Sequence, residues 1–364
     1  MKKNFLFRLS AIAMSLILVA CGGSTSEDVV ENETTAIESE ESLNVVVTTP
    51  MLGEFVKQVA GDSVVLDILM PAEADPHTYD PSPQDAAKIA DADIVLYVGI
   101  KYETSSLLKL IENTASTNAT LLEIGEEIDP IEFKDGEHDH DEEGHDDEDG
   151  HDDHDEEGHD DDKDHDHDDE DGHDDHDDEG HEGHDHGSED PHFWFDPVRV
   201  AMAVEVIKDS LVSLDPANSS TYEANADNFI SELTDLDAQV KELIESVSED
   251  NRKIVTTHEA LGYLEARYGI EIFATIIPSL STADEISPSQ IADVIDVIED
   301  NNIKVLFVES EAPSVYAETV VAEAGITAVT GLYVETLKDG QTYSDFLISN
   351  VTLIVESLNS AGEG

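Results

Sequence analysis

The sequence predicts an α/β protein with two lobes, each a mainly parallel sheet flanked by helices, joined by one long linking helix. Two series of short β-branched segments alternate with segments of helical length, which is the pattern of successive β-α-β units. Between the two series, residues 215–249 carry one continuous apolar stripe, which is typical of a single long helix.

The first lobe is expected over residues 43–214. Segments of helical length such as SPQDAAKIADA separate its strand-like runs, so the strands should lie parallel, with helices on both faces of the sheet. The predicted strands are LNVVVTT (43–49), VVLDILM (64–70), ADIVLYVG (92–99) and ATLLEI (119–124).

The second lobe is expected over residues 250–364 and repeats this alternation. The segment PSQIADVIDVIEDNN has the length and periodicity of one of its helices. The predicted strands are RKIVTTH (252–258), IEIFATI (270–276), IKVLFVES (303–310) and ITAVTGLY (326–333).

The linking helix is predicted to begin at Asp215, whose carboxylate would cap it, with Pro216 at the first helical position. It could run about 30 residues, or roughly 45 Å. A coiled coil is the competing interpretation, but a helix packed along both lobes explains so short a stripe equally well. The stripe consists of Tyr222, Ala226, Phe229, Leu233, Leu236, Val240, Leu243 and Val247.

The N-terminus has the features of a secretory signal peptide over residues 1–20. Three basic residues precede the apolar run LSAIAMSLILVA, which is too short to span a membrane as a mature helix. The run ends in LVAC, which resembles the lipobox of bacterial lipoproteins, so Cys21, the only cysteine, is expected to be lipid-modified. Residues 21–42 then have the composition of a disordered tether. The chain is therefore expected at the extracytoplasmic face of the cell membrane.

Residues 135–190 form a predicted disordered insert within the first lobe. They contain 33 acidic residues and one lysine, and EDGHDDHDEEGH (148–159) recurs as EDGHDDHDDEGH (170–181). With almost no apolar content, the insert cannot compensate for the entropy lost on folding. Thirteen of the sixteen histidines lie in it: His138, His140, His145, His151, His154, His159, His165, His167, His173, His176, His181, His184 and His186.

The charge of the chain excludes one class of partner. The formal net charge is −70, and no basic stripe is present, so nucleic acid would be repelled. Dense carboxylates also keep a protein hydrated in a salty or extracellular setting, which is the simplest explanation for the acidity outside the insert.

Four motifs carry the predicted chemistry. PAEADPHTYDPSP places His77 after a predicted strand, and SEDPHFWFDP repeats the Asp-Pro-His triplet at His192. In IVTTHEALGYLEARYG, His258 ends a strand, and the H-E-x-x-H pattern of zinc peptidases is absent. GLYVETL places Glu335 after the last strand, where it could supply a carboxylate.

These motifs resemble one known family. DPHTYDPSP, DPHFWFDP, HEALGYLEARYG and LYVETLKDGQTYSDFLISN, in this order, are similar to the metal-binding solute receptors of ABC importers, the zinc and manganese group. The resemblance covers residue 43 to the end and implies two α/β lobes with a metal between them and delivery to a membrane permease. It also implies that His77, His192 and His258 are ligands. Glu335 stands where the family usually has Asp.

The residues themselves favour Zn²⁺ over Mn²⁺. Three imidazoles and a carboxylate form a near-tetrahedral set that suits zinc, whereas manganese prefers more oxygen ligands. In the family, manganese receptors often have Glu at the third position, which here is His258. The alternatives are a manganese or iron receptor, or a metal-dependent adhesin, a role assigned to some family members.

A site closed by four protein ligands favours carriage over catalysis, so no enzymatic activity is expected. If Glu335 turned away, a three-histidine site would leave room for a metal-bound hydroxide, which is the enzymatic alternative. The histidines of the insert are expected to form many weak auxiliary metal sites, because imidazoles flanked by carboxylates bind metals interchangeably. The chain is expected to act as a monomer.

Overall fold

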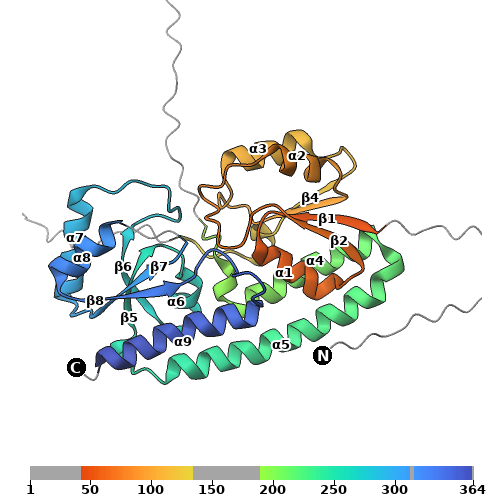
Figure 1. The fold of residues 1–364 in the computed structure, drawn as a ribbon. Coiled ribbons are helices and arrows are strands. Elements are labelled where there is room, and N and C mark those ends of the chain that lie inside the picture. The colour runs from red at the N-terminus through yellow and green to blue at the C-terminus, as the bar shows by residue number, and fades with distance from the viewer. Residues whose placement is uncertain (1–41, 134–188, 312–314, 363–364) are drawn as a thin grey trace, which may run out of the picture. The chain divides into compact units, whose positions relative to one another are not determined.

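The computed structural model describes residues 42–133, 189–311 and 315–362, which belong to one compact unit, Ser42–Gly364. The predicted signal peptide, the predicted tether as far as Glu41, including Cys21, and residues 135–188 of the predicted insert lie outside the described residues. Two four-stranded parallel sheets, each with helices on both faces, confirm the predicted fold class (Figure 1).

The first sheet has the strand order β2-β1-β3-β4, with every pair parallel. Alternate residues of β1 enter different cores: Val45 and Val47 pack with α1, whereas Val46 packs with α2 and α3. The elements are β1 (Leu43–Val47), α1 (Pro50–Ala60), β2 (Val64–Ile68), α2 (Pro83–Ala90), β3 (Ile94–Tyr97), α3 (Ser105–Thr114) and β4 (Thr120–Glu123).

The second sheet has the order β6-β5-β7-β8 and is also parallel. Val255 and Leu306 face α7 and α8, whereas Ile254 and Phe307 belong to the core on the opposite face. The elements are β5 (Lys253–His258), α6 (Gly262–Tyr268), β6 (Glu271–Ile277), α7 (Pro288–Asp300), β7 (Val305–Glu309), α8 (Val315–Ala324), β8 (Thr327–Leu332) and α9 (Tyr343–Gly362).

Four helices begin with a capping residue followed by proline at the first helical position. Ser82 caps α2 through a capping box with Asp85, and Ser287 caps α7 through one with Gln290. Thr49 and Asp196 cap α1 and α4 (Pro197–Leu214) in the same way, through one side-chain hydrogen bond each. The proline has a backbone suited to the first turn and lacks the N–H that would be unsatisfied there.

The prediction that Asp215 caps the long helix is wrong. Pro216–Asn218 form a short 3₁₀ turn, and α5 runs from Ser219 to Glu245, 27 residues. The Asp215 carboxylate accepts hydrogen bonds from Asn218 Nδ2 (2.7 Å) and the Tyr222 hydroxyl (2.6 Å) instead of a backbone amide of the helix. These side-chain bonds stabilise a separate turn before the helix.

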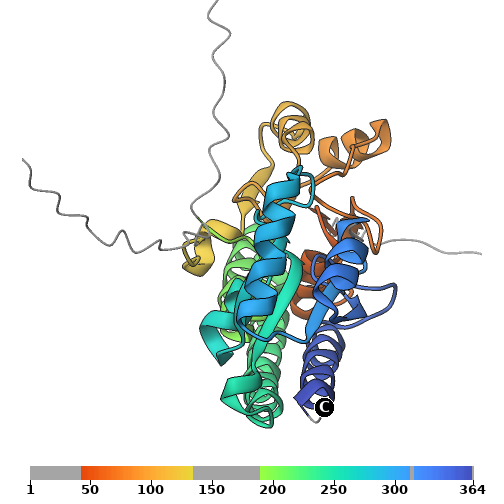
Figure 2. The same ribbon diagram turned by 90° about the vertical axis from the view of Figure 1, so that its left-hand side faces the viewer.

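Helix α5 joins the two lobes. It packs against α1 and α4 of the first lobe and against α9 at the C-terminus, and Figures 1 and 2 both show α9 beside it. Its buried stripe follows the prediction except at one position, where Ile244 is buried and Leu243 only partly so. A step of four from Val240 keeps the stripe on the same face of a straight helix.

One continuous apolar core extends from the first sheet through α5 and α9 to the second sheet. Phe55 of the first lobe packs edge to face against Tyr343 of α9, with 5.4 Å between ring centroids. Because relative motion of two lobes is restricted when a large apolar surface joins them, we expect the lobes to move little against each other.

The insert ends two residues earlier than predicted. Glu189 forms an antiparallel bridge with Glu132, and Asp190 is buried, with its backbone N–H bonded to the Ile131 carbonyl. These contacts place the last two residues of the predicted insert with the lobe.

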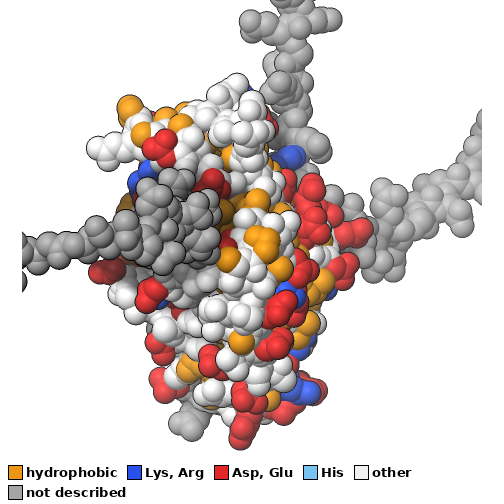
Figure 3. Space-filling model, turned by 90° about the vertical axis from the view of Figure 1, so that its right-hand side faces the viewer, with side chains coloured by type: hydrophobic (Ala, Val, Ile, Leu, Met, Phe, Trp, Pro, Cys, Tyr) orange, Lys and Arg blue, Asp and Glu red, His pale blue; other side chains and the backbone are white. Residues whose placement is uncertain are grey.

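The described surface is acidic. Acidic side chains gather along one edge of the face in Figure 3, and lysine and arginine are sparse there. None of the described helices is long and apolar enough to cross a membrane.

Candidate metal centre

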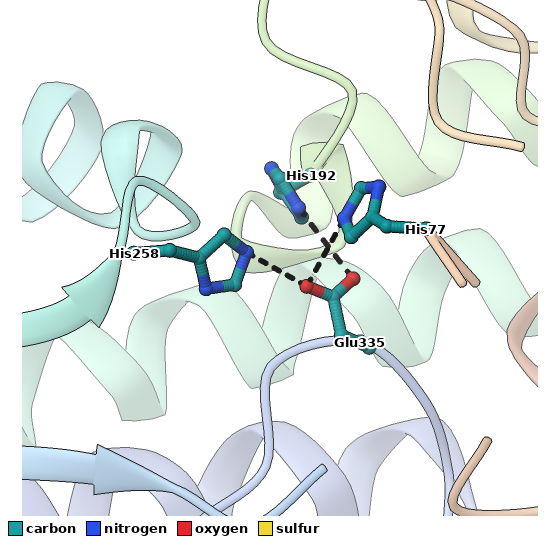
Figure 4. A group of neighbouring side chains, drawn as sticks. All are labelled: His77, His192, His258 and Glu335. Atoms are coloured by element: carbon teal, nitrogen blue, oxygen red, sulfur yellow. Dashed lines mark ion pairs between the residues drawn. The ribbon is translucent and has the colours of Figure 1, made fainter. Parts of the chain in front are cut away.

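The structure brings His77, His192, His258 and Glu335 together (Figure 4). His77 lies in the loop after β2, and His192 precedes the short 3₁₀ turn Phe193–Phe195. His258 is the last residue of β5, and Glu335 lies in the loop between β8 and α9. One potential ligand atom from each residue lies within 4.8 Å of the other three.

The Glu335 carboxylate points into the group of imidazoles. Its Oε1 lies 2.8 Å from His258 Nε2 and 3.4 Å from His77 Nε2, and its Oε2 lies 3.5 Å from His192 Nε2. The His192, His258 and Glu335 side chains are fully buried, and that of His77 is 2% exposed. Glu335 is therefore not turned away, as the enzymatic alternative would require.

The atoms that face one another lack hydrogen bonds. Among the buried side-chain atoms of the described residues, Nε2 of each histidine and both oxygens of Glu335 have no hydrogen-bond partner, although their separations are short enough for ion pairs. Buried polar groups are nearly always paired, because an unpaired one loses its interaction with water. These five convergent unpaired atoms are of the types that bind metals.

Two of the histidines are oriented by carboxylates on their other ring nitrogen. Asp190 Oδ1 lies 2.8 Å from His192 Nδ1 and accepts the His192 backbone N–H. Glu309 Oε2, at the end of β7, lies 2.5 Å from His258 Nδ1, and its Oε1 accepts the His258 backbone N–H. A carboxylate at Nδ1 fixes the tautomer that leaves Nε2 free to bind a metal and makes that nitrogen more basic.

Glu335 is held in place through its backbone. Glu311 Oε1 accepts from the N–H groups of Val334, Glu335 and Thr336, at 3.1, 3.2 and 3.4 Å. The Tyr102 hydroxyl donates to the Glu335 carbonyl at 2.8 Å. The loop that carries the carboxylate is thus fixed from both lobes.

The charges in the site are strongly coupled. Burial disfavours an imidazolium, but Glu335 and Asp190 outweigh it and raise the pKa of His192 to about 9. Burial is likewise outweighed at His258, where Glu309 and Glu335 raise the pKa well above its usual value. Burial would raise the pKa of Glu335, yet His77 and His192 hold it well below its usual range. Without a metal, the site therefore pairs one carboxylate with protonated imidazoles.

All three histidines outside the insert converge here, as the motifs predicted, together with Glu335. That these residues bind a metal remains a prediction. Sequence reasoning missed Asp190, Glu309 and Glu311 as supporting residues. Asp190 begins the repeated Asp-Pro-His triplet, which was a usable signal. The insert histidines and Cys21 lie outside the described residues.

Comparison with known proteins decides the family. The sequence profile of the ZnuA family, described as zinc-uptake complex component A, periplasmic, matches residues 45–357. This chain is a member of the ZnuA family. The resemblance inferred from the four motifs is thereby confirmed.

Other ZnuA relatives differ in the metal that their names give. The zinc-binding lipoprotein AdcA of Streptococcus pneumoniae is 30% identical over 376 residues, covering 100% of this chain, which spans only 62% of the length of AdcA. The manganese ABC transporter substrate-binding lipoprotein ScaA of Streptococcus gordonii is 26% identical over 328 residues, 88% of this chain and 90% of ScaA.

A solved structure shares the ZnuA fold seen here. The periplasmic zinc-binding protein TroA of Treponema pallidum superimposes with a TM-score of 0.68 at 21% identity, covering 86% of this chain and 98% of TroA. This likeness supports the two-lobed α/β fold.

Proposed function

We propose that this chain is an extracytoplasmic zinc receptor that holds one Zn²⁺ between its lobes and delivers it to an ABC permease. The observation that carries the proposal is the convergence of three buried Nε2 atoms on a buried carboxylate, all without hydrogen-bond partners. Such a set matches a cation that takes both nitrogen and oxygen ligands.

The donor set supports zinc over manganese. Three imidazole nitrogens and one carboxylate form a closed site of four protein ligands, and zinc commonly takes such a tetrahedral arrangement. Manganese prefers sites richer in oxygen. The names of AdcA and TroA, which give zinc, point the same way, whereas that of ScaA gives manganese.

Carriage suits this site better than catalysis. Four protein ligands leave no open position for a reactive water, which a hydrolytic zinc site requires. The name of ScaA links it to an ABC transporter, and this supports a permease as the partner here. The acidic surface offers nothing that would attract nucleic acid.

The metal preference can be tested by titration calorimetry of the full chain and of a variant lacking residues 138–186. We expect the shortened protein to bind one Zn²⁺ tightly and Mn²⁺ more weakly, because the four ligands remain. The full chain should bind further Zn²⁺ weakly through the insert histidines. Equal stoichiometry in the two proteins would contradict the auxiliary role of the insert, and tighter binding of Mn²⁺ than of Zn²⁺ would contradict the zinc assignment.

The membrane anchor is a separate part of the proposal. Cys21 follows the predicted signal peptide, and the names of both AdcA and ScaA include the word lipoprotein. Cys21→Ser should therefore shift most of the protein from the membrane fraction into the soluble extracytoplasmic fraction, measured by immunoblotting of fractionated cells. Substitution of the neighbouring Ser24 by Ala is the control and should leave the protein at the membrane. Unchanged membrane retention of Cys21→Ser would exclude lipidation at this residue.

A further inference from the structure

His77 differs from the other two histidines in its surroundings. No described residue forms a hydrogen bond with its Nδ1, whereas Asp190 and Glu309 orient the rings of His192 and His258. His77 also lines a cavity of about 460 Å³. This cavity is bounded by residues of segment 100–105 in the first lobe and of segment 279–284 in the second.

These surroundings identify the side on which an ion can be exchanged. A bound ion leaves when one ligand moves away and a water molecule or another ligand takes its position. Because carboxylates hold the other two imidazoles, His77 is the ligand that can swing away most easily, and it borders the cavity from which water can enter.

One carboxylate restrains the loop that carries His77. Asp75 Oδ1 accepts the His77 backbone N–H at 3.0 Å, and Asp75 Oδ2 accepts the Thr282 hydroxyl at 2.7 Å. Asp75 lies in the first lobe and Thr282 in the second, between β6 and α7. Figure 1 shows this β6–α7 segment as an arc that extends toward the first lobe.

The loop that carries Thr282 is hydrogen-bonded to the residue that follows His258. The backbone N–H of Glu259, which follows His258, donates to the Ser279 carbonyl at 3.0 Å. Ser279 Oγ accepts the Ser281 backbone N–H at 3.1 Å and is bonded to Asp284. A chain of hydrogen bonds and short loop segments therefore runs from the residue beside His258, through Thr282 and Asp75, to His77.

We propose that Thr282 and Asp75 are positioning residues that hold His77 against the ion and thereby set the rate at which the ion leaves. This inference rests on the proposed function, since it takes His77 to be a metal ligand. Near the site, the hydrogen bonds that Tyr102, Trp194 and Tyr263 donate between the lobes are buried, whereas the Asp75–Thr282 bond is partly exposed. The Asp75–Thr282 bond can therefore open without disturbing the core.

The test compares Thr282→Val, Thr282→Ser and the unmodified full chain, each loaded with half an equivalent of Zn²⁺ so that the tightest site fills first. Zinc transfer to a chromogenic chelator is followed by stopped flow. We expect release to be about two- to tenfold faster in Thr282→Val, the effect of losing one net hydrogen bond. Thr282→Ser keeps a hydroxyl and should restore the original rate.

Matched variants separate the possible outcomes. Thr78→Val removes a hydroxyl in the same loop that bonds only to the Asp75 carbonyl, and it should leave release unchanged. The melting temperature of each metal-free variant should lie within about 5 °C of that of the unmodified chain, the shift expected from one net hydrogen bond. An unchanged release rate in Thr282→Val would overturn the positioning role, and so would an equal acceleration in Thr78→Val. If His77→Ala retained tight zinc binding, the proposed metal site itself would be wrong.

Discussion

Replacement of His192 by alanine is expected to lower the affinity of the tight site for zinc by roughly a hundred- to a thousandfold. Four-ligand zinc sites contribute about 10–16 kcal/mol, so one ligand of four accounts for an effect of this size. His192 is fully buried and its Nε2 faces Glu335 with no hydrogen-bond partner. Competition with a chelator of known affinity, in the variant lacking residues 138–186, measures the change.

Two further variants distinguish the loss of a metal ligand from misfolding. His192→Ala leaves a cavity and removes the partner of Asp190, so Glu335→Gln provides a second test that keeps the size of the side chain but removes its charge. Asn113→Ala, at an exposed position of α3, is the control and should bind zinc like the parent protein. Parent-like zinc affinity in both His192→Ala and Glu335→Gln would show that the ion binds elsewhere.

The second large effect is expected from pH. In the metal-free protein the pKa of His192 is raised to about 9 and that of His258 is raised well above its usual value, so both hold protons at neutral pH. Zinc must displace these protons, so its apparent affinity should rise by about one to two orders of magnitude per pH unit between pH 6 and pH 8. Chelator competition at pH 6, 7 and 8 tests this, in the variant lacking residues 138–186.

The stability of the metal-free protein should change in the opposite direction. A histidine whose pKa is raised on folding stabilises the native state below its unfolded pKa, about 6.5, and this contribution is lost as the pH rises through its folded pKa. The melting temperature of the metal-free protein should therefore fall between pH 7 and pH 9, whereas that of the zinc-loaded protein should not. A zinc affinity independent of pH would contradict the proton displacement.

Much of the fold could be predicted because local patterns and tertiary structure agree. Seven predicted strands contain the observed ones and the eighth misses only Ile277 at the end of β6, since β-branched runs bounded by turn residues have few alternative conformations. The start of α5 could not be predicted. The Asp215 carboxylate accepts hydrogen bonds from the side chains of Asn218 and Tyr222 instead of capping the helix, and these contacts form only in the folded structure. The end of the insert was missed because the burial of Asp190 depends on contacts with Ile131 and His192.

The four converging residues could also be predicted, because the repeated Asp-Pro-His triplet marked two of them and the resemblance to the metal receptors of ABC importers implied the set. Their supporting residues could not. In the sequence, Glu309 looks like any acidic residue at the end of a strand. It orients the His258 ring only because β7 pairs with β5. Glu311 holds the loop of Glu335 by accepting hydrogen bonds from backbone amides about 24 positions along the chain, and no pattern in the neighbouring sequence predicts such a contact.

The most direct test is a crystal structure of the zinc-loaded protein, with diffraction data collected on both sides of the zinc absorption edge. We expect one anomalous peak between the lobes, about 2.0–2.1 Å from Nε2 of His77, His192 and His258 and about 2.0–2.2 Å from a Glu335 oxygen. A crystal that contains one equivalent of zinc but shows no peak among these four side chains, or a zinc ion bound only elsewhere, would contradict the account.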